Sequence, residues 1–194
     1  MSTLIASSRP VVLADLIPGG RVRDAVLVVS GAALTGLCAQ LSIHTPLSPV
    51  PFTLQTFAVL LTGAALGSWR GVLSMLVYLV AGGLGLPWYA HGSSGWGGPS
   101  FGYLVGFVLA AAVVGWLSER RADRQVLSTA GQFVIGSVLV YLVGASWLAA
   151  DLHLSAGRAF ALGVRPFLVT DAVKAALAAV ALPSAWSLVG GRGE

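Results

Sequence analysis

Charged side chains are scarce in this sequence. Of its 194 residues only 9% are Asp, Glu, Lys or Arg, whereas 56% are hydrophobic. A soluble globular domain needs about a quarter of its residues charged to cover its surface. The composition therefore excludes an ordinary soluble protein and predicts a chain whose main solvent is the lipid bilayer.

Cysteine and lysine are rarer still. The single cysteine, Cys38, excludes an intramolecular disulfide and a cysteine-rich metal site. The single lysine, Lys174, is followed by alanine, so the chain lacks the glycine-rich phosphate-binding loop in which Lys precedes Ser or Thr. We therefore expect that ATP drives this protein only through a partner.

The three histidines do not form a reactive group in the sequence. His44, His91 and His153 stand at unrelated spacings in predicted loops, which matches neither a metal-ligand pattern nor a nucleophile and base. We expect no enzyme activity, no cofactor and no metal. The net charge is +4, but the basic residues stand at the ends of apolar segments, so nucleic acid is not an expected partner.

Apolar segments of about the length that crosses a bilayer core are separated by short polar clusters. The segment 44–51 contains three prolines and cannot continue a helix, while Pro166 suits the first turn of one. The pattern predicts an all-α membrane protein. Its six-transmembrane-helix bundle is expected to have spans at 24–43, 52–67, 71–86, 101–118, 126–149 and 166–189.

The arginines indicate the orientation of this bundle. In the predicted topology only Arg158 and Arg165 lie on one side, and the others share the opposite side: Arg9, Arg21, Arg23, Arg70, Arg120, Arg121, Arg124 and Arg192. Positive loops stay in the cytoplasm, so both termini are predicted to be cytoplasmic. We expect a cytoplasmic lead over 1–23, one transmembrane binding domain over 24–190 and a cytoplasmic tail over 191–194.

Two charged residues lie inside the last predicted span. Asp171 and Lys174 stand roughly 7 and 12 Å past Pro166 along a helix that rises ~1.5 Å per residue. Their spacing of three residues puts them on one face, and intramembrane charges face the bundle interior. They are the first candidates for a ligand site. The alternative is a buried ion pair that only fixes helix packing.

Further polar and aromatic residues gather at the same outer end. Thr53 and Gln55 begin the second predicted span and Tyr103 begins the fourth, which predicts a cup that opens outward. Gln55 could instead bond a neighbouring helix, and Tyr103 and Trp88 could be interfacial anchors. The glycine-rich connection 87–100 is long enough for a lid over the cup, with a flexible extracellular loop as the alternative.

Four blocks of sequence carry a family resemblance: PVPFTLQT at 49–56, GLP at 85–87, GPSFGYLVGF at 98–107 and DAVK at 171–174. Together they resemble the BioY family of biotin transporters over roughly 24–188. The resemblance implies a biotin-capture subunit, or S component, of an energy-coupling-factor transporter in the cytoplasmic membrane of a prokaryote. Its expected partners are biotin, a transmembrane coupling subunit and two ATPase subunits.

The resemblance also implies how biotin is held. Asp171 and Lys174 are expected to contact its ureido ring, because a carboxylate accepts the ring N–H groups and an ammonium donates to its carbonyl. Backbone N–H groups of the connection, Ser93, Ser94 or Tyr89 are then expected to receive the carboxylate, with Trp88 and Trp96 enclosing the apolar rings. The connection 87–100 contains no arginine, so if a basic group there normally holds the carboxylate in this family, this chain holds it in another way.

Docking to a coupling subunit is expected through small residues on the first span. The pair here is Ala32 and Gly36, which departs from the Ala-xxx-Ala pattern of many capture subunits. Two other functions stay open from the sequence. One is a stand-alone biotin facilitator or ion-coupled carrier without an ATPase, and the other is a membrane scaffold without a ligand.

Overall fold

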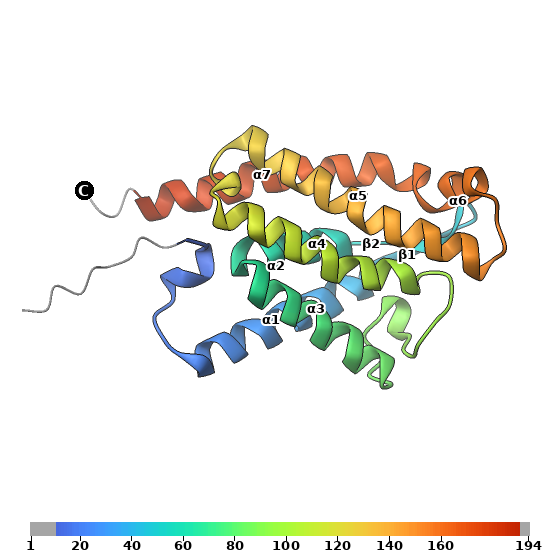
Figure 1. The fold of residues 1–194 in the computed structure, drawn as a ribbon, viewed down its shortest axis with the longest axis horizontal. Coiled ribbons are helices and arrows are strands. Elements are labelled where there is room, and N and C mark those ends of the chain that lie inside the picture. The colour runs from blue at the N-terminus through green and yellow to red at the C-terminus, as the bar shows by residue number, and fades with distance from the viewer. Residues whose placement is uncertain (1–10, 191–194) are drawn as a thin grey trace, which may run out of the picture.

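Seven α-helices run through residues 11–190, the part of the chain that the computed structural model describes (Figure 1). In chain order the elements are η1 Leu13–Leu16, α1 Arg21–Gln40, β1 Ser42–Thr45, β2 Ser48–Thr53, α2 Gln55–Leu66, α3 Ser68–Gly83, η2 Ala90–Gly92, α4 Phe101–Glu119, η3 Ala122–Arg124, α5 Val126–Asp151, α6 Ala156–Gly163, η4 Arg165–Phe167 and α7 Leu168–Gly190. Five of the predicted spans match α1 to α5 to within a few residues, and the sixth matches α7.

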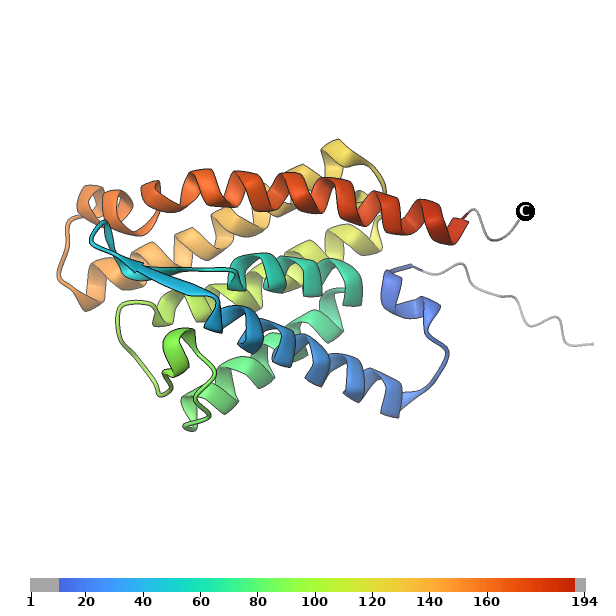
Figure 2. The same cartoon turned by 180° about the vertical axis from the view of Figure 1, so that it is seen from behind.

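Helix α4 is the centre of the bundle and packs against α2, α3 and α5. Helices α1 and α3 pair on one side of it, and α5 and α7 pair on the other, as Figures 1 and 2 show from the two faces. Glycines permit these close approaches. A Cβ on Gly106 of α4 would lie 3.0 Å from the Cα of Val140 on α5. Small residues thus bring the helix backbones together, as is usual in membrane bundles.

The link between α2 and α3 is a single residue, Gly67, with φ of +84°. Only glycine takes this left-handed conformation without strain. The turn is held from α4, because the Glu119 carboxylate accepts hydrogen bonds from the backbone N and the Oγ of Ser68, at 2.8 and 2.7 Å. This contact fixes α4 against the helical hairpin of α2 and α3.

One end of the bundle, which we call the basic end, is held together by polar contacts. It consists of the link between α2 and α3, the start of α1, the connection between α4 and α5 and the end of α7. Arg70 pairs with Asp15 and Asp24, each at 3.0 Å. On the other side of this end, Trp186 of α7 donates a hydrogen bond from Nε1 to the buried Asp123. The hairpin of β1 and β2, the connection between α3 and α4, and α6 lie at the opposite end (Figure 1).

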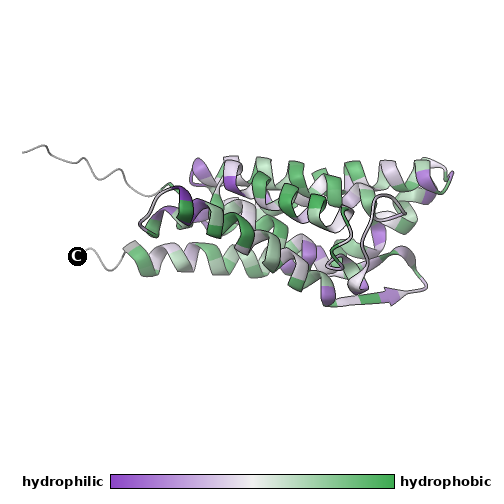
Figure 3. Cartoon of the chain, turned by 90° about the horizontal axis from the view of Figure 1, so that it is seen from below, coloured by the Kyte–Doolittle hydropathy of each residue, from purple (hydrophilic) through white to green (hydrophobic). Residues whose placement is uncertain are grey.

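The outward faces of the helices are strongly apolar. Large side chains such as Leu37, Leu142 and Val169 are 61–75% exposed. In Figure 3, green stretches that mark hydrophobic residues recur along the length of the helices. Four helical segments are long and apolar enough to cross a membrane: 21–40, 101–119, 126–151 and 156–189. The chain is therefore a mostly helical, multi-pass membrane protein.

Two of the six helices that match predicted spans are too short to cross the bilayer core on their own. Helix α2 has 12 residues and α3 has 16, which at ~1.5 Å per residue makes about 18 and 24 Å. Both are shorter than a hydrocarbon core of ~30 Å. The predicted tail 191–194, together with Arg9 and Arg192, lies outside the described residues, as does the first part of the predicted lead 1–23.

Two elements at the end opposite the basic end correct the all-α prediction and its connections. Residues 42–53 form an antiparallel hairpin in which Ser42 pairs with Thr53 and Thr45 with Ser48. A two-stranded ribbon consists of edge strands only, which is why its prolines are tolerated. The polar connection predicted over 150–165 contains the short helix α6, which begins at the N-cap Ser155, whose side chain accepts a hydrogen bond from the backbone N of Arg158.

Candidate functional site

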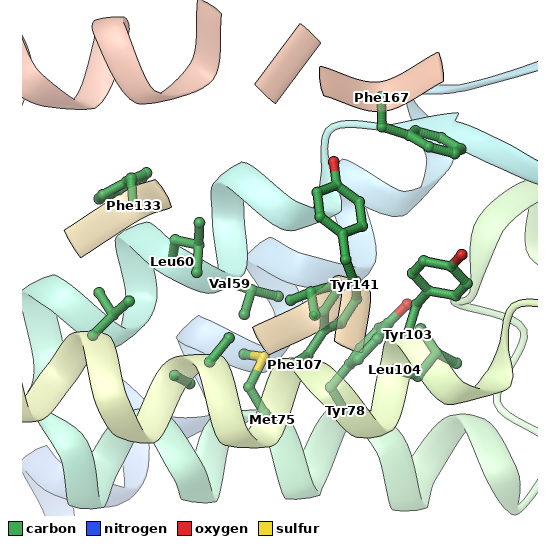
Figure 4. Close-up of a cluster of buried hydrophobic side chains, with 14 of the residues drawn as sticks. Val59, Leu60, Met75, Tyr78, Tyr103, Leu104, Phe107, Phe133, Tyr141 and Phe167 are labelled. Carbon is green, nitrogen blue, oxygen red and sulfur yellow. The ribbon is translucent and has the colours of Figure 1, made fainter. Parts of the chain in front are cut away.

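A cavity of about 370 Å³ lies at the end of the bundle opposite the basic end. The hairpin, the connection between α3 and α4, and the first two turns of α2, α4 and α7 surround it, while α5 contributes side chains from its second half. In Figure 4 the labelled rings of Tyr103, Tyr141 and Phe167, which line the cavity, lie at one side of the buried cluster. Val59, Leu60 and Phe133 fill the other side, so the cavity ends on packed hydrocarbon.

The ion pair of Asp171 and Lys174 forms part of the cavity wall. Lys174 Nζ lies 2.9 Å from Asp171 Oδ1, and the two side chains are only 14% and 9% exposed. The same ammonium donates to Thr56 Oγ1 at 2.6 Å and to the backbone carbonyl of Thr53 at 3.0 Å. An ammonium has three N–H groups, so Lys174 uses all of its donors within the protein.

Asp171 is held from two further helices. Its Oδ2 accepts a hydrogen bond from the hydroxyl of Tyr141 on α5, and its Oδ1 lies 3.5 Å from Thr56 Oγ1 on α2. The carboxylate thus joins α2, α5 and α7 at one point. Asp171 and Tyr141 also border a second, mostly apolar cavity between α5, α6 and α7, of about 800 Å³. They stand between the two cavities.

Gln55 begins α2 and is 4% exposed. Its amide Oε1 accepts a hydrogen bond from Thr53 Oγ1 at 3.1 Å, and its Nε2 donates to the hydroxyl of Tyr78 on α3. Tyr78 in turn donates to the backbone carbonyl of Trp88 at 3.3 Å. Gln55 thus bonds a neighbouring helix and also lines the cavity, so its geometry is compatible with both interpretations.

The connection between α3 and α4 is folded over this end and fastened at several points. Gln40, the last residue of α1, donates from Nε2 to the carbonyls of Trp88 and Tyr89 at 3.2 and 3.1 Å, and its Oε1 accepts from Gly92 N at 3.1 Å. The Tyr89 hydroxyl donates to the Leu79 carbonyl at 2.6 Å. Burial raises the pKa of Tyr89 to about 12, so the phenol stays a donor. These contacts favour the lid over the flexible loop.

Two histidines form the outer part of the cavity wall. The rings of His44, from β1, and His91, from η2, stack with centroids 3.9 Å apart and planes within 16° of each other. Ser42 Oγ lies 3.2 Å from His91 Nδ1. The exposed imidazoles therefore join the hairpin to the connection at the mouth of the cavity.

This chain is similar in sequence to known proteins. The sequence model of the BioY family matches residues 7–191. The chain belongs to the BioY family. A Pyrococcus horikoshii relative named as a probable biotin transporter is 39% identical over 163 residues, which are 82% of this chain and 94% of the relative. The biotin transporter BioY of Thermotoga maritima is 37% identical over 141 residues, 71% and 82% of the two chains.

A solved structure shares the fold of this BioY-family chain. It is described as the S-component for biotin from an ECF-type ABC transporter, and it matches with a TM-score of 0.75 at 24% identity. The match covers 86% of this chain and 92% of the solved chain. At this identity the likeness establishes the arrangement of the helices, and the roles of individual side chains have to be argued from their own geometry.

Seven of the predicted site residues line the cavity: Thr53, Gln55, Tyr89, Ser93, Tyr103, Asp171 and Lys174. Trp88 does not. Its Nε1 donates to the Tyr78 carbonyl at 3.0 Å and its ring packs on Gly36 of α1, so it fastens the connection to α1 and α3 instead. Tyr103 also carries a structural bond, because its hydroxyl donates to the Gly163 carbonyl of α6 at 2.8 Å.

The predicted docking pair lies inside the fold of the isolated chain. Ala32 is fully buried, and Gly36 is covered by Trp88, whose ring would lie 3.1 Å from an added Cβ. Neither residue presents a surface to another chain. The exposed side of α1 carries Val22, Val26 and Leu37.

Thr56, Tyr141, His44 and His91 were not predicted as site residues. Tyr141 is a single phenol in the long apolar segment 126–149, and such an isolated polar group is a signal that the sequence did contain. Thr56 gives no such signal, because threonine is common in membrane helices. Within 11–190 the structure brings together no group of three or more metal-binding side chains.

Proposed function

We propose that this protein captures biotin at the outer face of the cytoplasmic membrane of a prokaryote and serves as the S component of an energy-coupling-factor importer. The observation that carries the proposal is the buried pair of Asp171 and Lys174 in the wall of a cavity of about 370 Å³, in a chain of the BioY family. The names of its relatives in Pyrococcus horikoshii and Thermotoga maritima support the same ligand.

The chemistry of the pair suits a ureido ring. Asp171 can accept from the ring N–H groups, and Lys174 can donate to the ring carbonyl. Because Lys174 already donates three hydrogen bonds, the ligand carbonyl has to replace one acceptor, and the backbone carbonyl of Thr53 is the longest contact at 3.0 Å. Gln55 and Thr53 stand next to this point. The apolar bicycle would then lie against Tyr103 and Phe167.

The proposed orientation places the cavity outside and the basic end in the cytoplasm. Within the described residues, Arg21, Arg23, Arg70, Arg120, Arg121 and Arg124 belong to the elements of the basic end, whereas Arg158 and Arg165 belong to α6 and η4. This asymmetry supports cytoplasmic termini. We also propose six crossings within one domain, 24–190, in which the hairpin of 42–53 extends the short crossing of α2.

Transport would then require partners, because the chain carries no phosphate-binding loop. We propose a transmembrane coupling subunit and two ATPases, with the exposed side of α1 as the docking face. This proposal is supported by the solved S-component that shares the fold. The stand-alone carrier remains the alternative.

Two measurements test the proposal. Titration of the purified protein with biotin, followed by tryptophan fluorescence, is expected to give a submicromolar Kd, with no response to thiamine. A protein that does not bind biotin refutes the capture function. Biotin uptake is then compared in cells with and without coupling and ATPase subunits. Equal uptake in both strains would favour the stand-alone carrier.

A further inference from the structure

A positively charged group in the cavity wall would favour a ligand that brings a carboxylate. Among the described residues that line it, three side chains can carry a positive charge: Lys174, His44 and His91. Lys174 is already paired with Asp171 at 2.9 Å, so this pair adds no net charge. A carboxylate that lost water at this end without a cation of its own would bind poorly. The histidine pair is the remaining source of positive charge.

We infer that the stacked pair of His44 and His91 is the carboxylate-binding subsite of this cavity, and that it favours acidic over neutral forms of the ligand. The inference rests on the proposed function, because biotin carries one carboxylate at the end of a flexible chain. A ureido ring at Asp171 and Lys174 would leave that chain free to reach the mouth. The mouth is the place where both imidazoles line the wall.

The local structure holds the two rings ready for this role. His91 has φ of +58°, a left-handed conformation that is uncommon for residues other than glycine but is adopted by histidine, asparagine and aspartate more often than by most. Gln40 secures the backbone beside it through Gly92 N, and Ser42 Oγ lies 3.2 Å from its Nδ1. The Nε2 of His91 and the edge of the His44 ring are thereby left for a ligand. Either imidazole can carry a proton, and a carboxylate at the edges of the two rings would stabilise that positive charge.

Other candidates for the carboxylate are less suitable. Tyr89 donates its hydroxyl to the Leu79 carbonyl, and Ser93 donates to the Ala90 carbonyl at 2.8 Å. Helix α6 packs on β2, but its Arg158 is exposed and does not line the cavity. Arg165 of η4 is likewise exposed and outside the lining. The histidine pair combines a place in the wall with free ring nitrogens.

The test compares biotin with its primary amide, which keeps the ureido ring but has no charge. A carboxylic acid is ionised above about pH 6, whereas histidine loses its proton between about pH 6 and 8. For the wild-type protein we expect the amide to bind about fivefold more weakly than biotin at pH 6, the scale of an exposed ion pair, and the preference to shrink at pH 8. The other charged or ionisable side chains near this end, Asp171, Lys174, Tyr89, Tyr103, Arg158 and Arg165, act on both ligands, so their contributions largely cancel in the ratio.

His44→Gln and His91→Asn are expected to bring the ratio close to one at both pH values. Asparagine is chosen for position 91 because it tolerates the left-handed backbone. His153→Asn is the matched control: His153 also has a positive φ, of +50°, but does not line the cavity, and its replacement should leave the ratio unchanged.

Each result decides one question. Equal binding of biotin and the amide by the wild-type protein at pH 6 overturns the inference and leaves the capture function standing. An unchanged ratio in both histidine variants overturns it as well. If the wild-type protein binds neither ligand, the proposed function itself is wrong.

Discussion

Removing the Lys174 ammonium separates a ligand site from a structural ion pair. In Lys174→Met, Asp171 keeps the hydrogen bond from Tyr141 and a 3.5 Å contact with Thr56. Breaking a buried pair costs about 3–5 kcal/mol because the remaining charge is uncompensated. The two side chains are 14% and 9% exposed, so we expect the lower part of this range. Loss of one charge-assisted bond to the ligand costs at least about 1.5 kcal/mol, or more than tenfold in Kd.

The double variant Asp171→Asn with Lys174→Met decides between the two roles. It removes both charges, so no unpaired ion stays buried, and we expect it to recover most of the stability that the single variant loses. Its biotin affinity should stay at least tenfold reduced, because neither charged partner for the ureido ring is present. Unfolding can be followed by the reaction of the only cysteine, the half-buried Cys38, with a thiol-reactive dye on heating. Binding is measured on the same samples by tryptophan fluorescence.

The reasoning is refuted if the double variant regains both stability and wild-type affinity. The ion pair would then hold α7 in place and have no part in binding. It is also refuted if folded Lys174→Met binds biotin as well as the wild type. Loss of stability in the single variant alone does not distinguish the roles, which is why the two quantities are compared within one set of proteins.

Two further predictions concern the fold. Gly115→Ala should destabilise the protein by about 2 kcal/mol, because the added Cβ would lie 2.4 Å from Ser68 N and 2.5 Å from Gly67 C. The control is Gly131→Ala on α5, whose added Cβ meets nothing within 4 Å, so this variant should be neutral or stabilising. Equal melting temperatures for the two variants would contradict this prediction. Burial raises the pKa of Asp123 even though Trp186 and Arg124 favour its ionised form. Because the folded pKa lies above the unfolded value, the folded state holds this proton more tightly, so stability decreases as pH rises from about 4 through the raised pKa. Asp123→Asn should flatten this part of the profile of Tm against pH, and an unaltered profile would show that Asp123 does not cause it.

The positions of the long helices could be predicted because each depends on a local property, an apolar run ended by charge, glycine or proline. The hairpin could not, since its strands are only four and six residues long and β2 contains Pro49 and Pro51. Helix α6 was missed for a similar reason. Its eight residues carry no long apolar run, although Ser155 is a usual N-cap residue.

Some residues of the candidate site could likewise be predicted from local sequence, and others could not. Asp171 and Lys174 could be selected from sequence because charge inside an apolar span is costly and rarely accidental. Thr56 and Tyr141 bind the same pair from α2 and α5, so their part depends on how three helices meet. Trp88 is the opposite case, a predicted site residue that does not line the cavity. Its place beside a glycine-rich connection suggested ligand contact, but its ring fills the space that Gly36 leaves on α1.

The bonding of the cavity wall bears on specificity. Lys174 has no spare N–H group, and Gln55 and Tyr78 bond each other, so a ligand exchanges hydrogen bonds with the protein more than it adds them. In such an exchange, a ligand gains affinity only if it replaces each acceptor and donor that it displaces. An analogue that lacks the carbonyl or an N–H leaves a buried polar group unpaired, which costs about 1–3 kcal/mol. We therefore expect discrimination between ligands to depend on the complete donor and acceptor pattern of the ring. The apolar wall would contribute affinity but little specificity.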